Sequence, residues 1–352
     1  RVSILFVVLL AATIAAGASH RWLALAWNAW RYPTAAPADR TQIAITNQRA
    51  YLAAGVDGIE VVDLASTRRV SLLPPPAPAD RIDDLAAADG WLFALDATAP
   101  GFLFMYSLAN PDQPELVGQI VPVPVGPFSG VSAAAGVVAV SGGTSQLTLR
   151  EYDAAGRIGS NVVTADFGRG QPDIALRSDG KLAAISTHSF GPNFSMTLAE
   201  VRRAPLRLQA IGQVDLPLAG FTAGGYKPAH FPLVSAWQGD RLYVAHGGGL
   251  SVIDASDPRR PRVLADDPQA RPAMDIAVAA DALDLVRAGA SPAILRYRLD
   301  RDGLPVLIAI RPLTSGSKPG AIGSDGAYTL ITLLPQGWQF VLPAEFFAVP
   351  KS

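Results

Sequence analysis

The chain has 352 residues, of which 17% are charged, and its 29 Lys and Arg are balanced by 30 Asp and Glu. This balance provides no basic surface for a phosphate backbone, so we do not expect nucleic acid as a partner. Cysteine is absent, which excludes disulfides, thiolate metal sites and cysteine nucleophiles.

The N-terminal segment is apolar, because Val2–Ser19 contains no charged residue. It fits either an uncleaved anchor, which needs about 20 apolar residues, or a signal peptide cleaved at the A-x-A-like site Ala16-Gly17-Ala18. We favour a hydrophobic transmembrane helix within residues 1–31. The side chains expected in the membrane or at its surface are Leu5, Phe6, Leu9, Trp22, Trp27 and Trp30.

Both interpretations place the rest of the chain outside the cytoplasm, on the periplasmic or extracellular side of a bacterial inner membrane, or secreted if the segment is cleaved. The basic residues are mostly Arg, which is typical of GC-rich bacterial genomes. Residues 32–39 are rich in Pro and Ala and predict an extended linker. The main domain is therefore expected over residues 40–352.

A strand-turn-strand passage recurs along this domain. A small polar corner follows its second strand in the clearest copies, and we place the corners at Asp63, Ser107, Asp153, Glu200, Asp254, Arg298 and Val341. The steps are 44, 46, 47, 54, 44 and 43 residues. A period of roughly 40–50 residues with several short strands per unit is typical of a β-propeller. We therefore predict an all-β propeller of six to eight blades, with seven as the expected number.

The last blade, roughly residues 318–343, is one strand short in this pattern. Propellers remove exposed strand edges by closing the ring. We therefore expect a strand from about residues 36–46 to complete the last blade.

Two of the repeats carry a family resemblance. Gly58-Ile59-Glu60-Val61-Val62-Asp63-Leu64 and Gly249-Leu250-Ser251-Val252-Ile253-Asp254-Ala255-Ser256-Asp257-Pro258 resemble the LVIVD-repeat family of bacterial extracytoplasmic β-propellers. Tyr106-Ser107-Leu108-Ala109-Asn110-Pro111 matches less well, and the other repeats match only by spacing. The resemblance implies a propeller outside the cytoplasm and supplies no catalytic residues.

The repeated corner residues Asp63 and Asp254 are interpreted as turn residues, because an Asp side chain can accept hydrogen bonds from the next backbone N–H groups. The string His246-Gly247-Gly248-Gly249 resembles an esterase oxyanion-hole motif, but the chain has no G-x-S-x-G elbow, so we interpret it as a turn. The adjacent acids Asp83-Asp84 and Asp266-Asp267 should point to opposite faces of a strand. We interpret them as solvated charges.

Three histidines map to one face of the ring, and imidazole is a common metal ligand. They are weak metal candidates, because they are far apart in sequence and no carboxylate pair accompanies them: His188, His230 and His246. The long step between Glu200 and Asp254 marks an elaborated region. Its aromatic residues suit a protein contact, and the candidates are Phe190, Phe194, Phe221, Tyr226 and Phe231.

These observations support two hypotheses of different classes. The first is a membrane-tethered, non-catalytic scaffold or accessory subunit that binds a membrane-associated protein and needs no cofactor. The second is a metal-dependent hydrolase or lyase, or a small-molecule or glycan binder, that uses the mouth of the central channel.

Overall fold

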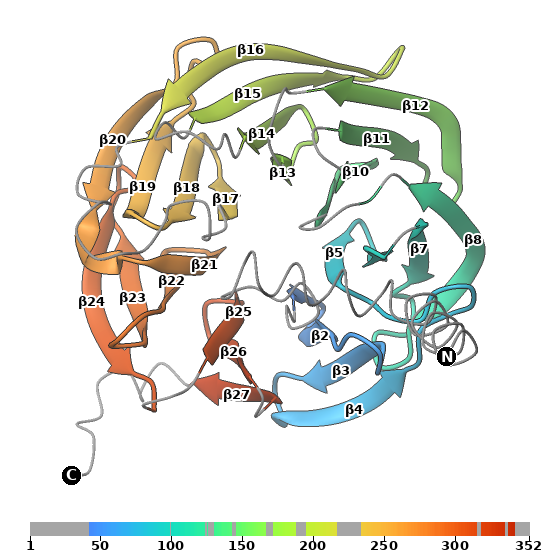
Figure 1. Cartoon of the computed structure of the whole chain (residues 1–352), viewed down its shortest axis with the longest axis horizontal. Helices are drawn as coiled ribbons and strands as arrows, with labels where there is room; N and C mark the ends of the chain where they lie inside the picture. Colours follow the sequence, from blue (N-terminus) through green and yellow to red (C-terminus); the bar gives the residue numbers. More distant parts are fainter. Residues whose placement is uncertain are drawn as a thin grey trace, which may run out of the picture. The chain divides into compact units, whose positions relative to one another are not determined.

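The computed structural model describes residues 42–98, 100–123, 125, 130–142, 146–166, 172–187, 195–216, 234–314, 318–334 and 337–341. The chain divides into two units, Arg1–Asp39 and Arg40–Ser352. The second unit is a ring of seven antiparallel sheets, the blades of a β-propeller (Figure 1). The predicted all-β architecture and the seven blades are confirmed.

Within each blade the strands follow in chain order from the centre of the ring outward (Figure 1). Blade one contains β1 (Ile43–Thr46), β2 (Arg49–Ala53), β3 (Ile59–Asp63) and β4 (Arg68–Leu73). Blade two contains β5 (Asp84–Ala88), β6 (Trp91–Asp96), β7 (Gly101–Ser107) and β8 (Glu115–Val123). Blade three contains β9 (Gly130–Ala134), β10 (Val137–Gly142), β11 (Gln146–Tyr152) and β12 (Ile158–Asp166).

Blade four contains β13 (Pro172–Leu176), β14 (Leu182–Thr187), β15 (Ser195–Arg202) and β16 (Arg207–Asp215). Blade five contains β17 (Val234–Gln238), β18 (Arg241–His246), β19 (Gly249–Asp254) and β20 (Arg262–Asp267), and the short 3-10 helix η3 (Pro268–Ala270) follows. Blade six contains β21 (Ala273–Ala279), β22 (Ala282–Arg287), β23 (Ala293–Leu299) and β24 (Pro305–Pro312). Blade seven contains β25 (Lys318–Ser324), β26 (Thr329–Leu334) and β27 (Gly337–Val341).

The two middle strands of a blade are buried on both faces, which explains why they read as continuous apolar runs. Every residue of β19 is buried, and all but the first residue of β18 are buried. The outer strand β24 alternates between half-buried and exposed positions. This difference makes the middle strands the clearest signal of the repeat in the sequence.

The outer strands share a second regularity. In all six four-stranded blades the pairing of the third strand with the fourth contains a register shift. Such bulges increase the local twist of a strand. The outer strands can therefore wrap around the rim while the inner strands stay aligned with the channel.

Seven apolar clusters lie between adjacent blades, one for each blade interface. Carboxylates add links near the channel. Asp84 Oδ2 of blade two accepts the Val131 N–H of blade three at 2.7 Å. Asp275 Oδ2 of blade six accepts the Ile322 N–H of blade seven at 2.8 Å. The core of the ring is thus a series of blade interfaces.

The predicted closing strand over residues 36–46 is wrong in its described part. Ile43–Thr46 forms β1, which pairs with β2 as the innermost strand of blade one. Asn47 and Gln48 both have positive φ angles and join β1 to β2 in a two-residue hairpin, which favours this pairing. In the described residues, blade seven has three strands and meets blade one through side chains that include Leu52, Val62 and Leu330.

The predicted N-terminal transmembrane helix falls on residues outside the described ranges. Within those ranges, no helix has the length and apolar character needed to cross a bilayer.

Candidate binding surface

The corner residues act as turn residues, as predicted. Asp63 Oδ1 accepts the Ala65 N–H at 2.9 Å, and Asp254 Oδ1 accepts the Ser256 N–H at 3.1 Å. An arginine at the start of the second strand pairs with each carboxylate: Arg49 with Asp63 at 3.1 Å and Arg241 with Asp254 at 2.6 Å. These aspartates therefore fix the turns that lead into the outer strands.

His246 is the only one of the three candidate histidines that lies in the described ranges, and it is buried inside blade five with 2% of its side chain exposed. Its Nδ1 accepts the Gly248 N–H at 3.0 Å, and its Nε2 lies 2.8 Å from Ser251 Oγ. Ser251 Oγ donates to Asp266 Oδ1 at 2.8 Å. Both ring nitrogens are therefore engaged.

The donor and acceptor roles in these hydrogen bonds decide whether Ser251 could act as a nucleophile. Because Nδ1 accepts a backbone N–H, the ring proton of neutral His246 resides on Nε2 and is donated to Ser251. The Ser251 hydroxyl proton then points to Asp266. A nucleophilic serine needs the opposite arrangement, in which the histidine accepts the serine proton. The hydrogen-bonded series His246–Ser251–Asp266 therefore has a structural role. The two glycines after His246 form the predicted turn between β18 and β19.

Acid should weaken the fold through His246. Burial, followed by the nearby charge of Arg271, lowers the pKa of His246 to about 4 from 6.5. The neutral ring of His246 adds its full contribution to the free energy of unfolding above pH 6.5. This contribution is lost as the pH falls toward 4, by roughly 3 kcal/mol. Urea unfolding at pH 7 and pH 4.5 checks this. His246→Gln, which cannot titrate, should lose less stability between these pH values than the wild type, and an equal loss would contradict the prediction.

The remaining sequence candidates fall outside the described residues, namely His188, His230, Phe190, Phe194, Phe221, Tyr226 and Phe231. They stay predictions. Within the described ranges, no group of three or more His, Asp or Glu side chains could hold a metal ion.

The interpretation of the paired acids as solvated charges is wrong for Asp83. Its carboxylate bonds to Arg81 at 2.6 Å and accepts the Ala97 N–H at 2.9 Å, and burial raises its pKa. Asp266 and Asp267 do point to different neighbours, as predicted: Asp266 binds Ser251, whereas Asp267 accepts the Tyr297 hydroxyl of blade six at 2.8 Å. At Asp83, donors from the neighbouring strand and from Arg81 replace water, whereas Asp266 stays exposed as expected.

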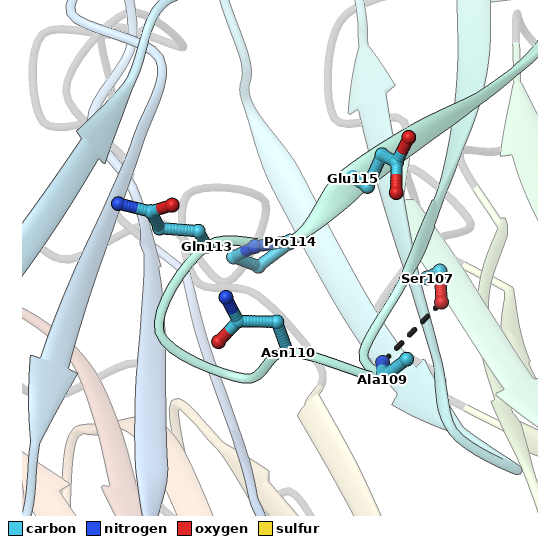
Figure 2. Close-up of a pocket in the computed structure, with 6 residues that line it drawn as sticks. All are labelled: Ser107, Ala109, Asn110, Gln113, Pro114 and Glu115. Carbon is cyan, nitrogen blue, oxygen red and sulfur yellow. Dashed lines mark hydrogen bonds between the residues drawn. The ribbon is translucent and has the colours of Figure 1, made fainter.

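A polar hollow of about 560 Å³ lies beside the turn between β7 and β8. Figure 2 shows the amides of Asn110 and Gln113 extending from the turn and Glu115 at the start of β8. The turn is ordered by its own bonds, because Asn110 Oδ1 accepts the Asp112 N–H at 3.2 Å. Its lining residues are Ser107, Ala109, Asn110, Gln113, Pro114 and Glu115.

A second hollow of about 550 Å³ adjoins the first and shares Ser107 and Ala109 with it. It lies between blades two and three. Its wall is held by Asp89, whose Oδ2 accepts the Tyr152 hydroxyl at 2.8 Å and the Gly136 N–H at 2.7 Å. The half-buried indole of Trp91 also lines it. We call the two hollows together the blade-two groove.

The ionisable side chains that line the blade-two groove are acidic. Asp89, Glu115 and Asp153 line it, and no Lys or Arg is among its described lining residues. Amide side chains donate and accept hydrogen bonds, and carboxylates attract cations. The groove therefore suits an extended ligand that has hydrogen-bonding groups and a positive charge.

The groove lies at the end of the ring opposite the turn between β18 and β19 that follows His246. In an antiparallel blade, the turn between the third and fourth strands shares an end of the sheet with the turn between the first and second strands. Turn length gives no sequence signal for the groove, because the turn Leu108–Pro114 has seven residues and the equivalent turn of blade five, residues 255–261, has seven as well.

The sequence matches no family model and no curated protein. Solved structures match by fold. The β-propeller domain of Cps50 (Swd1) from Myceliophteria thermophila has a TM-score of 0.61 at 12% identity, covering 86% of this chain and 95% of that chain. A chain of a mitotic checkpoint complex has a TM-score of 0.61 at 10% identity, covering 86% and 90%. At these identities the similarity establishes the propeller fold alone.

Proposed function

We propose that this propeller is a non-catalytic scaffold that binds a protein partner, and that the partner presents an extended basic segment to the blade-two groove. The observation that carries the proposal is the pair of adjoining hollows on one ordered turn, lined by amides and carboxylates. A peptide offers backbone donors and acceptors to Asn110 and Gln113. A Lys or Arg side chain complements Glu115, whereas Asp153 is already paired with Arg157 at 2.7 Å.

A photo-crosslinking residue at Gln113 tests this binding mode in cells. We expect a discrete protein adduct from Gln113 and none from the matched position Gln209, an exposed glutamine on the outer strand of blade four. Glu115→Lys should lower the adduct yield roughly tenfold, because it places like charges together. Asp57→Lys makes the same charge change at an exposed turn of blade one and should not lower the yield. Equal adducts from both glutamines would reject the groove.

The aromatic side chains of the elaborated region are a second candidate surface for the same function. They are tested in the same assay by replacing Phe190, Phe194 and Phe221 with Ala. A loss of the partner with these variants but not with Glu115→Lys would assign binding to the aromatic surface instead of the groove.

We further propose that the scaffold is tethered outside the cytoplasm by the apolar segment Val2–Ser19 and is a divergent member of the LVIVD-repeat family. The tether is supported by the uncharged apolar sequence. The family is supported by two glycines at the start of a third strand: Gly58 immediately precedes β3, and Gly249 is the first residue of β19.

Replacing Leu5, Phe6 and Leu9 with Asp should release the protein from membranes. A charged residue at the centre of a spanning helix costs about 3 kcal/mol on insertion scales, so three of them prevent insertion. Carbonate-washed membranes are assayed for the wild type and the variant. A wild-type protein that is removed by the wash would contradict the tether.

A further inference from the structure

The turn that carries the blade-two groove is held by three side chains of blade one. The hydroxyl of the buried Tyr51 donates to the Pro111 carbonyl at 3.0 Å. Ser71 Oγ, on the outer strand β4, donates to the Asp112 carbonyl at 2.5 Å. Arg49 Nε lies 2.5 Å from Asp112 Oδ1. Two consecutive residues of the turn are therefore fixed to the neighbouring blade.

The two fixed residues lie between the two amides that the groove offers to a ligand. Asn110 and Gln113 line the groove and extend from the turn (Figure 2), whereas Pro111 and Asp112 are not among its lining residues. The Asn110 carbonyl accepts the Gln113 N–H at 3.2 Å, which closes these four residues into a β-turn. A displacement of Pro111 or Asp112 therefore displaces both amides.

Arg49 connects this turn to the corner of its own blade. Its Nη1 lies 3.1 Å from Asp63 Oδ1, while its Nε contacts Asp112. A guanidinium presents its donors in a rigid planar fork. The corner of blade one and the turn of blade two are therefore held in one fixed arrangement.

Blade five provides an internal comparison. Among the second strands that the structure describes, only β2 and β18 begin with Arg-x-Tyr. Tyr243, the equivalent of Tyr51, donates its hydroxyl to the Gly303 carbonyl of blade six at 2.8 Å. Arg241 Nε donates to the Asp302 carbonyl at 3.0 Å. The Arg-x-Tyr pair thus fixes the turn between the third and fourth strands of the next blade in both places.

Two features distinguish the contacts made by blade one. Ala265 of β20 occupies the place of Ser71, because each pairs with the valine two residues before the corner aspartate. An alanine side chain donates no hydrogen bond. Arg241 reaches a backbone carbonyl, whereas Arg49 reaches the Asp112 carboxylate. The turn of blade two therefore has one further hydrogen bond, and a charged acceptor in place of a carbonyl.

We propose that Arg49, Tyr51 and Ser71 are positioning residues of the blade-two groove, so that blade one sets its affinity for the basic segment of the partner. This inference rests on the scaffold function proposed above. Ordering a loop at the moment of binding costs affinity, and a loop that is ordered beforehand avoids this cost. The additional contacts occur at the turn that carries the groove, and no residue of blade six lines either hollow.

Tyr51→Phe tests the positioning role, with Tyr243→Phe as its matched control. Both tyrosines are fully buried, and both variants keep the ring but lose one hydrogen bond to a turn carbonyl. We expect Tyr51→Phe to lower the adduct yield of the photo-crosslinking residue at Gln113 about fivefold, the effect of one hydrogen bond, and Tyr243→Phe to change it by less than about twofold. Urea unfolding should show similar losses of stability for the two variants.

Ser71→Ala is a milder variant, because blade five carries alanine at the equivalent place and Ser71 is only half-buried. In the purified full-length protein we expect this variant to exchange the amide hydrogens of the turn 108–114 about fivefold faster than the wild type. Exchange in the turn 300–304 of blade six should not change. This measurement needs no partner. The adduct yield at Gln113 should fall as it does for Tyr51→Phe.

The outcomes separate this inference from the scaffold function. Adducts that fall in Tyr51→Phe and Ser71→Ala but persist in Tyr243→Phe support the positioning role. Equal adduct yields in the wild type and both blade-one variants overturn it and leave the scaffold function standing. An equal fall in all three variants, or unchanged exchange of the turn in Ser71→Ala, overturns it as well. If the wild type gives no adduct from Gln113, the groove itself is rejected and this inference falls with it.

Discussion

Gly249→Ala should destabilise the ring by about 3–5 kcal/mol. Gly249 begins β19 with a φ of +135°, in a region that side chains other than glycine rarely adopt. A Cβ at this position would lie 2.2 Å from the Asp267 carbonyl oxygen of the neighbouring strand β20. The obstacle is backbone, so it cannot move aside as a side chain could. Urea unfolding of the purified variant measures the change.

A control variant separates the steric clash of the added Cβ from the cost of the positive φ angle. Gly239→Ala also places alanine at a positive φ, +56°, but its Cβ would meet no atom within 4 Å. We expect this variant to lose about 1 kcal/mol, the ordinary effect of alanine at such a φ. Similar losses for the two variants would show that the close approach to Asp267 is not what requires glycine at 249.

The same requirement applies in blade one, which explains why the two blades look alike in sequence. Gly58 has a φ of +94°, and its Cβ would lie 2.0 Å from the Leu73 carbonyl oxygen of β4. Glycine at this place lets the turn before the third strand pass under the end of the fourth. The glycine that marks the repeat in the sequence is thus a packing requirement.

The repeat was predictable because it depends on local residues. The middle strands are buried on both faces, so stretches such as Leu242–Ala245 stay apolar in every clear blade. The strand over residues 36–46 was expected, but its described part, β1, was assigned to blade seven instead of blade one, because four residues with one buried side chain do not indicate their partner strand. Its place in blade one depends on pairing with β2.

The site was harder to predict than the fold, because its residues lie on different strands and only the pairing register of those strands brings them together. His246, Ser251 and Asp266 come from three successive strands, and only the pairing of these strands brings them together. The blade-two groove depends on the length of one turn and on contacts with the next blade, such as Tyr152 to Asp89. Neither feature has a residue pattern that periodicity detects.

Asp284→Ala should also lower the free energy of unfolding, by about 3–5 kcal/mol. Asp284 is fully buried in β22 and accepts the Thr329 hydroxyl of blade seven at 2.5 Å. The Nε of Arg296 lies 3.6 Å from its Oδ1. Removing the carboxylate leaves a buried guanidinium without its counter-charge, and takes away a link between blades six and seven. Urea unfolding measures the loss, and Asp240→Ala, which removes an exposed partner of Arg177, should change little.

A double variant distinguishes the cost of a lone charge from the value of the pair. Desolvation, the largest influence, raises the pKa of Asp284, which Thr329 and Arg296 lower only in part. The pair therefore stays costly to bury, and its attraction serves mainly to offset that cost. Asp284→Leu with Arg296→Met should recover most of the stability that Asp284→Ala loses, because no buried charge remains. If the double variant is as unstable as Asp284→Ala, the hydrogen bonds of Asp284 with Thr329 and of Arg296 with the Gly326 carbonyl are required to hold blades six and seven together.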